Sequence, residues 1–184
     1  MPPDQPSHPF PIIEILIAAV IVLAIAVGVV FFGMEKRRLS ADLRCQHQLE
    51  QIGMAMMMYS SANRGAWPPA RDPRSGHCWA DLLAASFLDT TEVLVCPLSR
   101  PPRGAHNPCT YGYNGAVASH PGAPGADTIV LLDYDRVVVD PAAPGKYVAG
   151  RHRGKAFAAL GDGSVRGLMP AAIKAGGWTP VPGD

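Results

Sequence analysis

An uncharged apolar run near the N-terminus constrains this chain most. Residues 15–34 (ILIAAVIVLAIAVGVVFFGM) are 20 consecutive residues without a charge. A helix of that length spans about 30 Å, which is the thickness of the hydrocarbon core of a bilayer. We therefore predict a transmembrane helix over residues 10–34 and a single-pass membrane protein.

A cleaved secretory signal is the main alternative for such a run. Signals of that kind carry a basic segment, an apolar stretch of about 7–15 residues and a small-residue cleavage site. Here the first eleven residues contain no Lys or Arg, and the Ala-x-Ala at residues 24–26 lies inside the run. These features favour the membrane helix.

Glu14 stands directly before the run, in the first turn of a helix that begins at Pro11. Two interpretations stay open. A carboxylate there suits the positive end of the helix dipole. Alternatively, an acid at an apolar entrance indicates a partner, such as the N-terminal amine of a neighbouring subunit.

The sequence becomes amphipathic after the basic residues 36–38. From residue 45 onward, apolar residues recur in steps of four and three, which places them on one helical face. They are Cys45, Leu49, Ile52, Met56 and Tyr59. The methionines at 54, 56, 57 and 58 are expected to be adaptable packing. We predict one helix over Pro11–Ala62, ended by residues 63–65, with residues 35–63 as its amphipathic continuation.

Residues 64–169 are predicted to form a loop-rich β-containing domain, followed by a tail at 170–184. A helix is expected at 79–88, with Trp79, Leu82, Leu83 and Phe87 toward the core. Strands are expected at 128–133 and 136–140, joined by a tight turn, and at 156–160 and 165–168, joined by residues 161–164. The fold class is α+β: a long N-terminal helix packed on a small antiparallel sheet.

Charge and motifs exclude several functions. The chain has 16 basic and 15 acidic residues, so its net charge is +1 and it lacks the basic field that nucleic-acid binding requires. Gly-x-Ser-x-Gly, His-Glu-x-x-His and phosphate-loop motifs are absent from the sequence. We therefore expect no enzymatic activity and no catalytic residues.

Several motifs, in order along the chain, carry a family resemblance. Phe10-Pro11-Ile12-Ile13-Glu14 and the long helix resemble type IV pilins and type II secretion pseudopilins, whose processing motif reads Gly-Phe-Thr-Leu-Ile-Glu. Motifs of one bacterial branch are similar to residues 44–55, to Cys96-Pro97, to Tyr111-Gly112-Tyr113-Asn114, and to His152 followed after nine residues by Asp162-Gly163.

The resemblance implies a structural subunit of a pilus-like or type II secretion pseudopilus filament. It would be anchored in the bacterial inner membrane before assembly, with its C-terminal domain outside the cytoplasm. The basic residues 36–38 alone favour the opposite orientation. The implied partners are the membrane, copies of this chain, other pilin-like subunits and a prepilin peptidase, and Glu14 would act in assembly.

Processing is implied between Pro9 and Phe10, with methylation of Phe10 and with residues 1–9 as a leader-like segment. Pro9 stands where the family has its cleavage glycine, and Pro11 replaces the threonine. Proline restricts the backbone on both sides of the cut. The alternative function is therefore an unprocessed, membrane-anchored surface binding module that does not assemble.

The cysteine spacings are not those of zinc knuckles. Outside the cytoplasm a disulfide is expected. Our hypothesis pairs Cys96 with Cys109, which closes a loop of about 14 residues, and leaves Cys45 as a buried free thiol. Cys78 is a further disulfide candidate, since four cysteines permit three full pairings.

His152 and the Asp162-Gly163 turn form the most functional-looking motif. The structural interpretation is that His152 hydrogen-bonds Asp162 across the hairpin while Gly163 takes a positive φ. The alternative is a metal site that includes His152, Asp162 and Asp133. Because major pseudopilins can hold calcium, a calcium site at Asp133 and Asp162 is the form considered, although calcium prefers oxygen ligands over histidine. Otherwise no cofactor is expected.

Overall fold

The computed structural model describes residues 11–99, 108–118, 122–139 and 148–173. The chain divides into two compact units, residues 1–40 and residues 41–184. One helix, α1 (Pro11–Ala62), runs through both, with the bounds that the sequence predicts. The fold is α+β, as predicted: a long N-terminal helix and a small sheet.

The described part of the first unit is helical and apolar. Its large apolar side chains are exposed all around the helix, from 49% at Met34 to 71% at Ile12. By length and composition this helix is able to cross a membrane. The ammonium group of Lys36 lies 4.8 Å from the centre of the Phe32 ring, just past the uncharged run.

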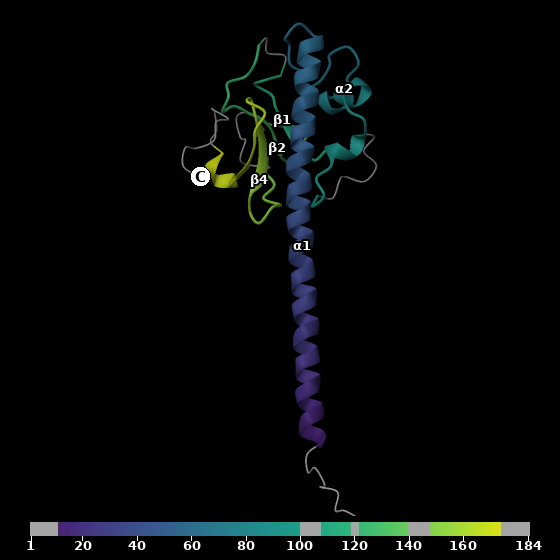
Figure 1. Cartoon of the computed structure of the whole chain (residues 1–184). Helices are drawn as coiled ribbons and strands as arrows, with labels where there is room; N and C mark the ends of the chain where they lie inside the picture. The colour runs from purple at the N-terminus through teal and green to yellow at the C-terminus, as the bar shows by residue number, and fades with distance from the viewer. Residues whose placement is uncertain (1–10, 100–107, 119–121, 140–147, 174–184) are drawn as a thin grey trace, which may run out of the picture. The chain divides into compact units, whose positions relative to one another are not determined.

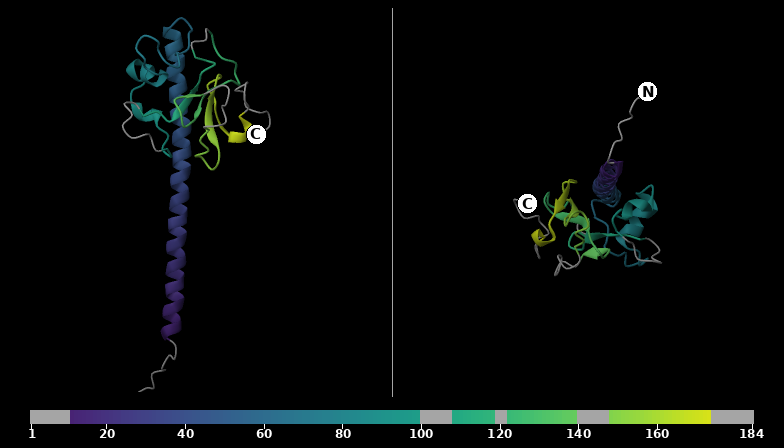
Figure 2. Two further views of the ribbon diagram at one scale, coloured as in Figure 1. Left: turned by 180° about the vertical axis from the view of Figure 1, so that it is seen from behind. Right: turned by 90° about the horizontal axis from the view of Figure 1, so that it is seen from below.

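The second unit contains residues 41–62 of α1, the sheet and, among its described residues, three shorter helical segments (Figure 1). The helical segments that follow α1 are α2 (Trp79–Ser86) and the 3-10 helix η1 (Thr91–Leu94), and a further 3-10 helix, η3 (Pro170–Ala172), follows the sheet. The strands are β1 (Tyr111–Asn114), β2 (Ile129–Asp133), β3 (Val138–Val139), β4 (Ala156–Leu160) and β5 (Val165–Leu168). Within this unit, the strands lie on one side of α1 and α2 lies on the other (Figures 1 and 2).

The sheet has the strand order β3-β1-β2-β4-β5. The pairs β1–β2, β2–β4 and β4–β5 are antiparallel, and the β4–β5 hairpin has the predicted residues. The predicted hairpin of residues 128–133 with 136–140 is wrong. Both hydrogen-bonding edges of β2 are taken by β1 and β4, so β3 pairs in parallel with β1 instead.

The two faces of the sheet bury different cores. Alternate side chains of a strand point to opposite faces. One face packs against α1 and α2, with Tyr111, Tyr113, Leu131, Phe157 and Ala159 in the core. The other face buries Leu132, Tyr134, Val139, Ala156, Ala158, Leu160, Leu168 and Ile173. A register shift between Ile129 and Leu131 places Val130 and Leu131 in the same core.

The predicted stripe of the amphipathic helix is confirmed. Cys45, Leu49, Ile52 and Met56 are fully buried, and Tyr59 packs against their core. Of the four methionines expected to be adaptable packing, Met56 is fully buried, whereas the other three lie on other faces of α1 and are 43–50% exposed.

The ends of the helices follow from local geometry. After Ala62, Arg64 and Gly65 adopt positive φ angles of 58° and 84°, which stops α1. Helix α2 begins at Trp79 as predicted and ends at Ser86. The indole Nε1 of Trp79 donates a hydrogen bond of 2.6 Å to the carbonyl of Val137, which ties α2 to the segment before β3.

Candidate functional site

A buried polar cluster lies where the first turns of α1 in the second unit meet the sheet. It consists of Cys45, Cys96, Asp133 and His152, whose exposed fractions are between 0% and 3%. Each residue offers one atom able to bind a metal ion, and these four atoms lie within 4.8 Å of one another. Such a concentration of ionisable groups in a core is unusual, because buried charges are costly unless they are paired.

Strand alternation and the helical stripe place two members of the cluster. Cys45 is the first buried residue of the α1 stripe. Asp133 is the last residue of β2 and follows Leu131 by two positions, so both side chains point to the α1 face. The Cys45 Sγ consequently lies 3.7 Å from Oδ2 of Asp133.

A tight turn before β4 places His152. Arg153 and Gly154 have positive φ angles of 55° and 83° at the two central positions of the turn. The backbone groups of His152 and Lys155 bond one another in both directions, at 3.1 and 3.0 Å. Two successive positive φ angles are typical of the type I′ turn, and here they hold His152 against the sheet.

The loop after η1 brings Cys96 to the cluster. The backbone N–H of Cys96 donates to Oγ1 of Thr110 at 2.7 Å, and the N–H of Thr110 donates to the carbonyl of Leu94. This loop is therefore fixed to the residue that precedes β1. The Cys96 Sγ lies 3.3 Å from Nε2 of His152.

The imidazole of His152 is held on both nitrogens. Its Nδ1 lies 2.6 Å from Oδ1 of Asp42, and its Nε2 lies 3.0 Å from Oδ2 of Asp133. The Phe157 ring packs on the imidazole with the ring centres 4.5 Å apart. Burial opposes the charged form of His152, but the hydrogen bonds to Asp133, Cys96 and Asp42 outweigh burial and raise its pKa to about 10.

The two thiols of the cluster have pKa values shifted in opposite directions. A hydrogen bond from Cys45, assisted by one from His152, lowers the pKa of Cys96 to about 6 despite its burial. The same bond to Cys96, together with burial, raises the pKa of Cys45. The cluster by itself thus favours a Cys96 thiolate beside a His152 imidazolium.

An outer layer of polar groups surrounds the cluster. Arg151 donates to Oδ1 of Asp133 at 3.1 Å and also pairs with Asp135. The hydroxyl of Tyr111 lies 3.3 Å from the Cys45 Sγ and donates to Oε1 of Gln48 at 3.0 Å. These contacts fix the side chains of the cluster in place.

The arrangement offers four ligand atoms of the kinds that bind a transition-metal ion. It combines two sulfur atoms, one imidazole nitrogen and one carboxylate oxygen, which are the ligand types that zinc binds. The four side chains are almost fully buried.

The predicted pair of His152 with Asp162 is wrong. The side-chain polar contacts described for His152 go to Asp42, Cys96 and Asp133. Asp162 is exposed in the β4–β5 turn, where its Oδ1 accepts a hydrogen bond from the N–H of Ser164 at 2.8 Å and Gly163 has a φ of 84°. The metal-site candidates Asp133 and His152 are thus brought together, whereas Asp162 lies outside the cluster.

The expected disulfide of Cys96 with Cys109 is not formed. All four cysteines are free thiols. The sulfur of Cys96 faces Cys45 and His152, whereas Cys109 donates to the carbonyl of Tyr111 at 3.4 Å. The thiol of Cys78 lies 3.1 Å from Asp81 in the first turn of α2. Cys45 is buried and free, as predicted.

The N-terminal site residues are separate from this cluster. Glu14 lies in the first turn of α1 and is exposed. Pro9 and Phe10, the expected processing residues, lie outside the described residues.

Sequence reasoning missed Asp42 and Arg151 as parts of the site. Asp42 was open to detection, because it lies one helical turn before Cys45 and residues three apart share a helix face. Arg151 directly precedes His152 and carries no comparable periodic signal.

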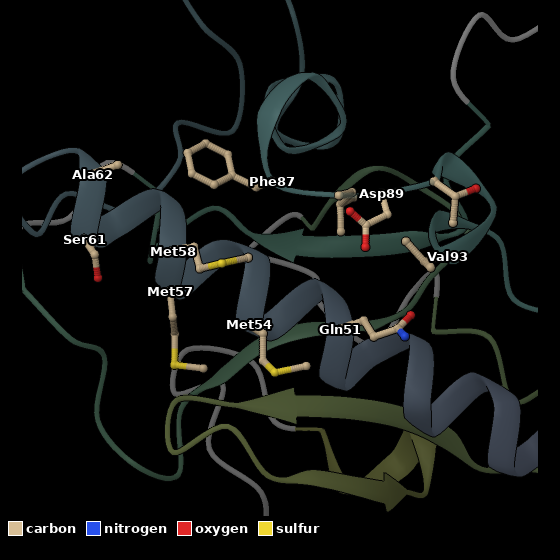
Figure 3. Close-up of a pocket in the computed structure, with 11 residues that line it drawn as sticks. Gln51, Met54, Met57, Met58, Ser61, Ala62, Phe87, Asp89 and Val93 are labelled. Atoms are coloured by element: carbon tan, nitrogen blue, oxygen red, sulfur yellow. The ribbon is translucent and has the colours of Figure 1, made fainter.

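An open apolar groove of about 790 Å³ lies on the surface of the second unit. Figure 3 shows Met54, Met57 and Met58 of α1 around it, together with Phe87 and Val93 from the segment that follows. Its lining contains no Cys or His. The groove therefore offers packing surface, and the buried cluster is the site with reactive groups.

Comparisons of the chain with protein-family models, with curated proteins and with solved structures find no match.

Proposed function

We propose that this chain is a membrane-anchored structural subunit of a pilus-like or type II secretion pseudopilus filament. The observation that carries the proposal is the apolar surface of α1 between Ile12 and Met34, which is exposed on every side. A helix that is apolar all round needs apolar surroundings on every side. Lipid supplies them before assembly, and identical helices of neighbouring subunits supply them in a filament.

Glu14 gives this surface a defined register. It is the one charged residue between Ile12 and Met34. In a filament core an unpaired carboxylate costs several kcal/mol, so it requires a cationic partner. The amine of a neighbouring N-terminus at Phe10 would be that partner, and each subunit would then settle at one fixed height relative to the next.

The motif order along the chain supports the same proposal. The segment from Phe10 to Glu14 and the motifs around Cys45, Cys96, Tyr111 and His152 resemble those of pilin-like proteins in sequence. In this proposal the second unit lies outside the cytoplasm of a bacterium, and the chain has no catalytic role.

A second candidate rests on Pro9. Peptidases of this family cut after a small residue, and a proline at that place restricts the backbone. An uncut chain would keep its helix in the membrane as a permanent anchor, and the second unit would act as a surface binding module.

The mass of the mature N-terminus tests the two candidates. The chain is isolated from membranes of a host with a prepilin peptidase, beside a Pro9→Gly variant that restores the family motif and serves as the control. A wild-type chain that starts at methylated Phe10 supports the filament subunit. If only the Pro9→Gly variant is cut, the wild-type chain is an anchor and the filament proposal fails.

A further inference from the structure

The geometry of the buried cluster matches a tetrahedral metal site. In a zinc site with Zn–S bonds of about 2.3 Å and Zn–N or Zn–O bonds of about 2.0–2.2 Å, neighbouring ligand atoms lie about 3.3–3.8 Å apart. The corresponding distances here are 3.0 Å between His152 and Asp133, 3.3 Å between Cys96 and His152, and 3.7 Å between Cys45 and Asp133. The other pairs of ligand atoms lie within 4.8 Å of one another, so shifts of up to about 1 Å convert this arrangement into the tetrahedral one.

The partner of Nδ1 of His152, the carboxylate of Asp42, also supports a metal site. Metal-binding histidines usually donate their other ring N–H to a carboxylate, which fixes the tautomer and the ring orientation. Nδ1 of His152 lies 2.6 Å from Oδ1 of Asp42, so Nε2 is the nitrogen that faces the two sulfurs and Asp133. A histidine whose role was only to pair with acids would not need two sulfur atoms beside Nε2.

Charge balance also favours a divalent cation. Two thiolates and the Asp133 carboxylate carry three negative charges, of which a divalent ion neutralises two. The guanidinium of Arg151, 3.1 Å from Oδ1 of Asp133, compensates the third. Asp42 has its own cationic neighbour in Arg153, whose Nε lies 4.0 Å from Oδ2. Arg151 also pairs with Asp135, but that carboxylate is exposed and screened by solvent, so the loaded site would be neutral in the interior of the unit.

We propose that Cys45, Cys96, Asp133 and His152 bind one Zn²⁺ ion in a closed structural site. Four protein ligands leave no open position for water or substrate, which distinguishes structural from catalytic zinc. Sulfur and nitrogen ligands exclude Ca²⁺ and Mg²⁺, which require oxygen. On binding, Cys45 and Nε2 of His152 give up their protons to solvent, and the two sulfurs bind as thiolates. The proposal is independent of the proposed function.

Metal analysis of the full chain tests the proposal directly. The chain is purified in detergent, exposed to Zn²⁺ and dialysed, and its metal content is measured. We expect one Zn²⁺ per chain. Replacement by Co²⁺ should give the visible bands of a tetrahedral site and an ultraviolet thiolate-to-cobalt band. Absence of bound metal, or a cobalt spectrum without the thiolate band, would overturn the proposal.

Matched variants assign the ligands. Cys96→Ser and His152→Gln should each lose the metal, whereas Cys109→Ser should keep it, because Cys109 is equally a buried thiol but bonds the carbonyl of Tyr111 outside the cluster. If Cys96→Ser keeps the full cobalt spectrum, the ligand set is wrong.

Thiol mapping of the wild-type chain keeps the test decisive if a variant fails to fold. In the zinc-loaded chain a mercurial reagent should release the metal as it modifies Cys45 and Cys96, and both should be identified by peptide mapping. Release that follows modification of Cys78 or Cys109 contradicts the site. A Cys45–Cys96 disulfide in the chain as isolated from cells also contradicts it, because a disulfide removes both thiolates.

Discussion

Nδ1 of His152 lies 2.6 Å from Oδ1 of Asp42, a residue 110 positions earlier in the chain. This contact orients the imidazole. The described polar contacts of Asp42 are with His152 and Arg153, and none is with the three residues around Nε2, which are Cys45, Cys96 and Asp133. Asp42 is therefore a positioning residue. Its removal should weaken the site without removing a ligand.

Asp42→Asn should reduce the affinity for Zn²⁺ by about 10- to 100-fold, the usual effect of losing an outer-layer carboxylate. The thiolate-to-cobalt band should be retained, because all four ligands are still present. Competition with a chromophoric chelator measures the affinity. Asp162→Asn is the control, since it removes an equal charge from the exposed β4–β5 turn. Equal affinity in the Asp42 variant and the wild type would show that this contact does not support the metal.

Chelation should lower the thermal stability of the second unit. An ion that binds the folded chain alone stabilises it by about 2.7 kcal/mol at a hundred times its dissociation constant, so the transition should rise with the Zn²⁺ concentration. Thermal unfolding of the detergent-solubilised chain, followed by tryptophan fluorescence, measures the change. Cys96→Ser should show no response to either metal or chelator, and a response equal to that of the wild type would contradict the prediction.

Glu14→Ala should leave membrane insertion intact and abolish filament assembly. The substitution removes the one charge from the apolar segment, so partition into lipid is not impaired, but the register contact is lost. Membrane fractionation and sheared-filament yield measure the two effects. Glu35→Ala removes an acid beyond the apolar run and should assemble normally. Normal incorporation of the Glu14 variant into filaments would refute its assembly role.

Gly112→Ala should destabilise the second unit by about 1–3 kcal/mol through overpacking. A Cβ at Gly112 would lie 2.7 Å from Cβ of Tyr134 and 2.7 Å from Cγ2 of Val139. At Gly115 the nearest atom, the carbonyl oxygen of Val139, is 3.5 Å away, so Gly115→Ala should change the stability by about 0.5 kcal/mol or less. Denaturant unfolding compares the two. Equal stabilities would mean that β1 moves aside without cost.

Met56→Ala should cost about 2–5 kcal/mol, because Met56 is fully buried and its truncation leaves a cavity. Met54→Ala should change the unfolding free energy by about 0.5 kcal/mol or less, since Met54 is 50% exposed in the groove. Denaturant unfolding of both variants provides the comparison. A large loss of unfolding free energy in Met54→Ala would contradict the prediction and would mean that other residues cover Met54 in the groove.

Helical periodicity and turn residues in the sequence predicted the buried face of α1 and the β4–β5 hairpin, because both depend on residues close together in the chain. The steps of four and three from Cys45 to Met56 gave the buried stripe of α1, and the Gly-rich turn between Leu160 and Val165 gave the β4–β5 hairpin. The partner of β3 was not predictable in this way, because it depends on which edges of β2 are already occupied. β1 was missed because its four residues include Gly112 and Asn114, which are uncommon in strands.

His152 and Asp133 were metal-site candidates from the sequence, but the two cysteines of the cluster were out of reach for a different reason. Metal motifs are recognised by short spacings between ligands, whereas Cys45 and Asp133 are 88 residues apart and Cys96 and His152 are 56 apart. Each residue has an ordinary local explanation: a helix stripe, a strand end, a loop cysteine, a turn. Their convergence is a property of the tertiary structure alone.

The wide spacing of the cluster also bears on the order in which the chain is made. Asp42 and Cys45 leave the ribosome long before the turn at residues 152–155, yet the imidazole of His152 is the group that joins the helix acid, the loop thiol and the strand acid. Until that turn is synthesised, Asp133 and both sulfurs lack their common partner. Completion of the cluster therefore requires that translation has passed the turn before β4, and a chain that stops before His152 lacks the group that joins Asp42, Cys96 and Asp133.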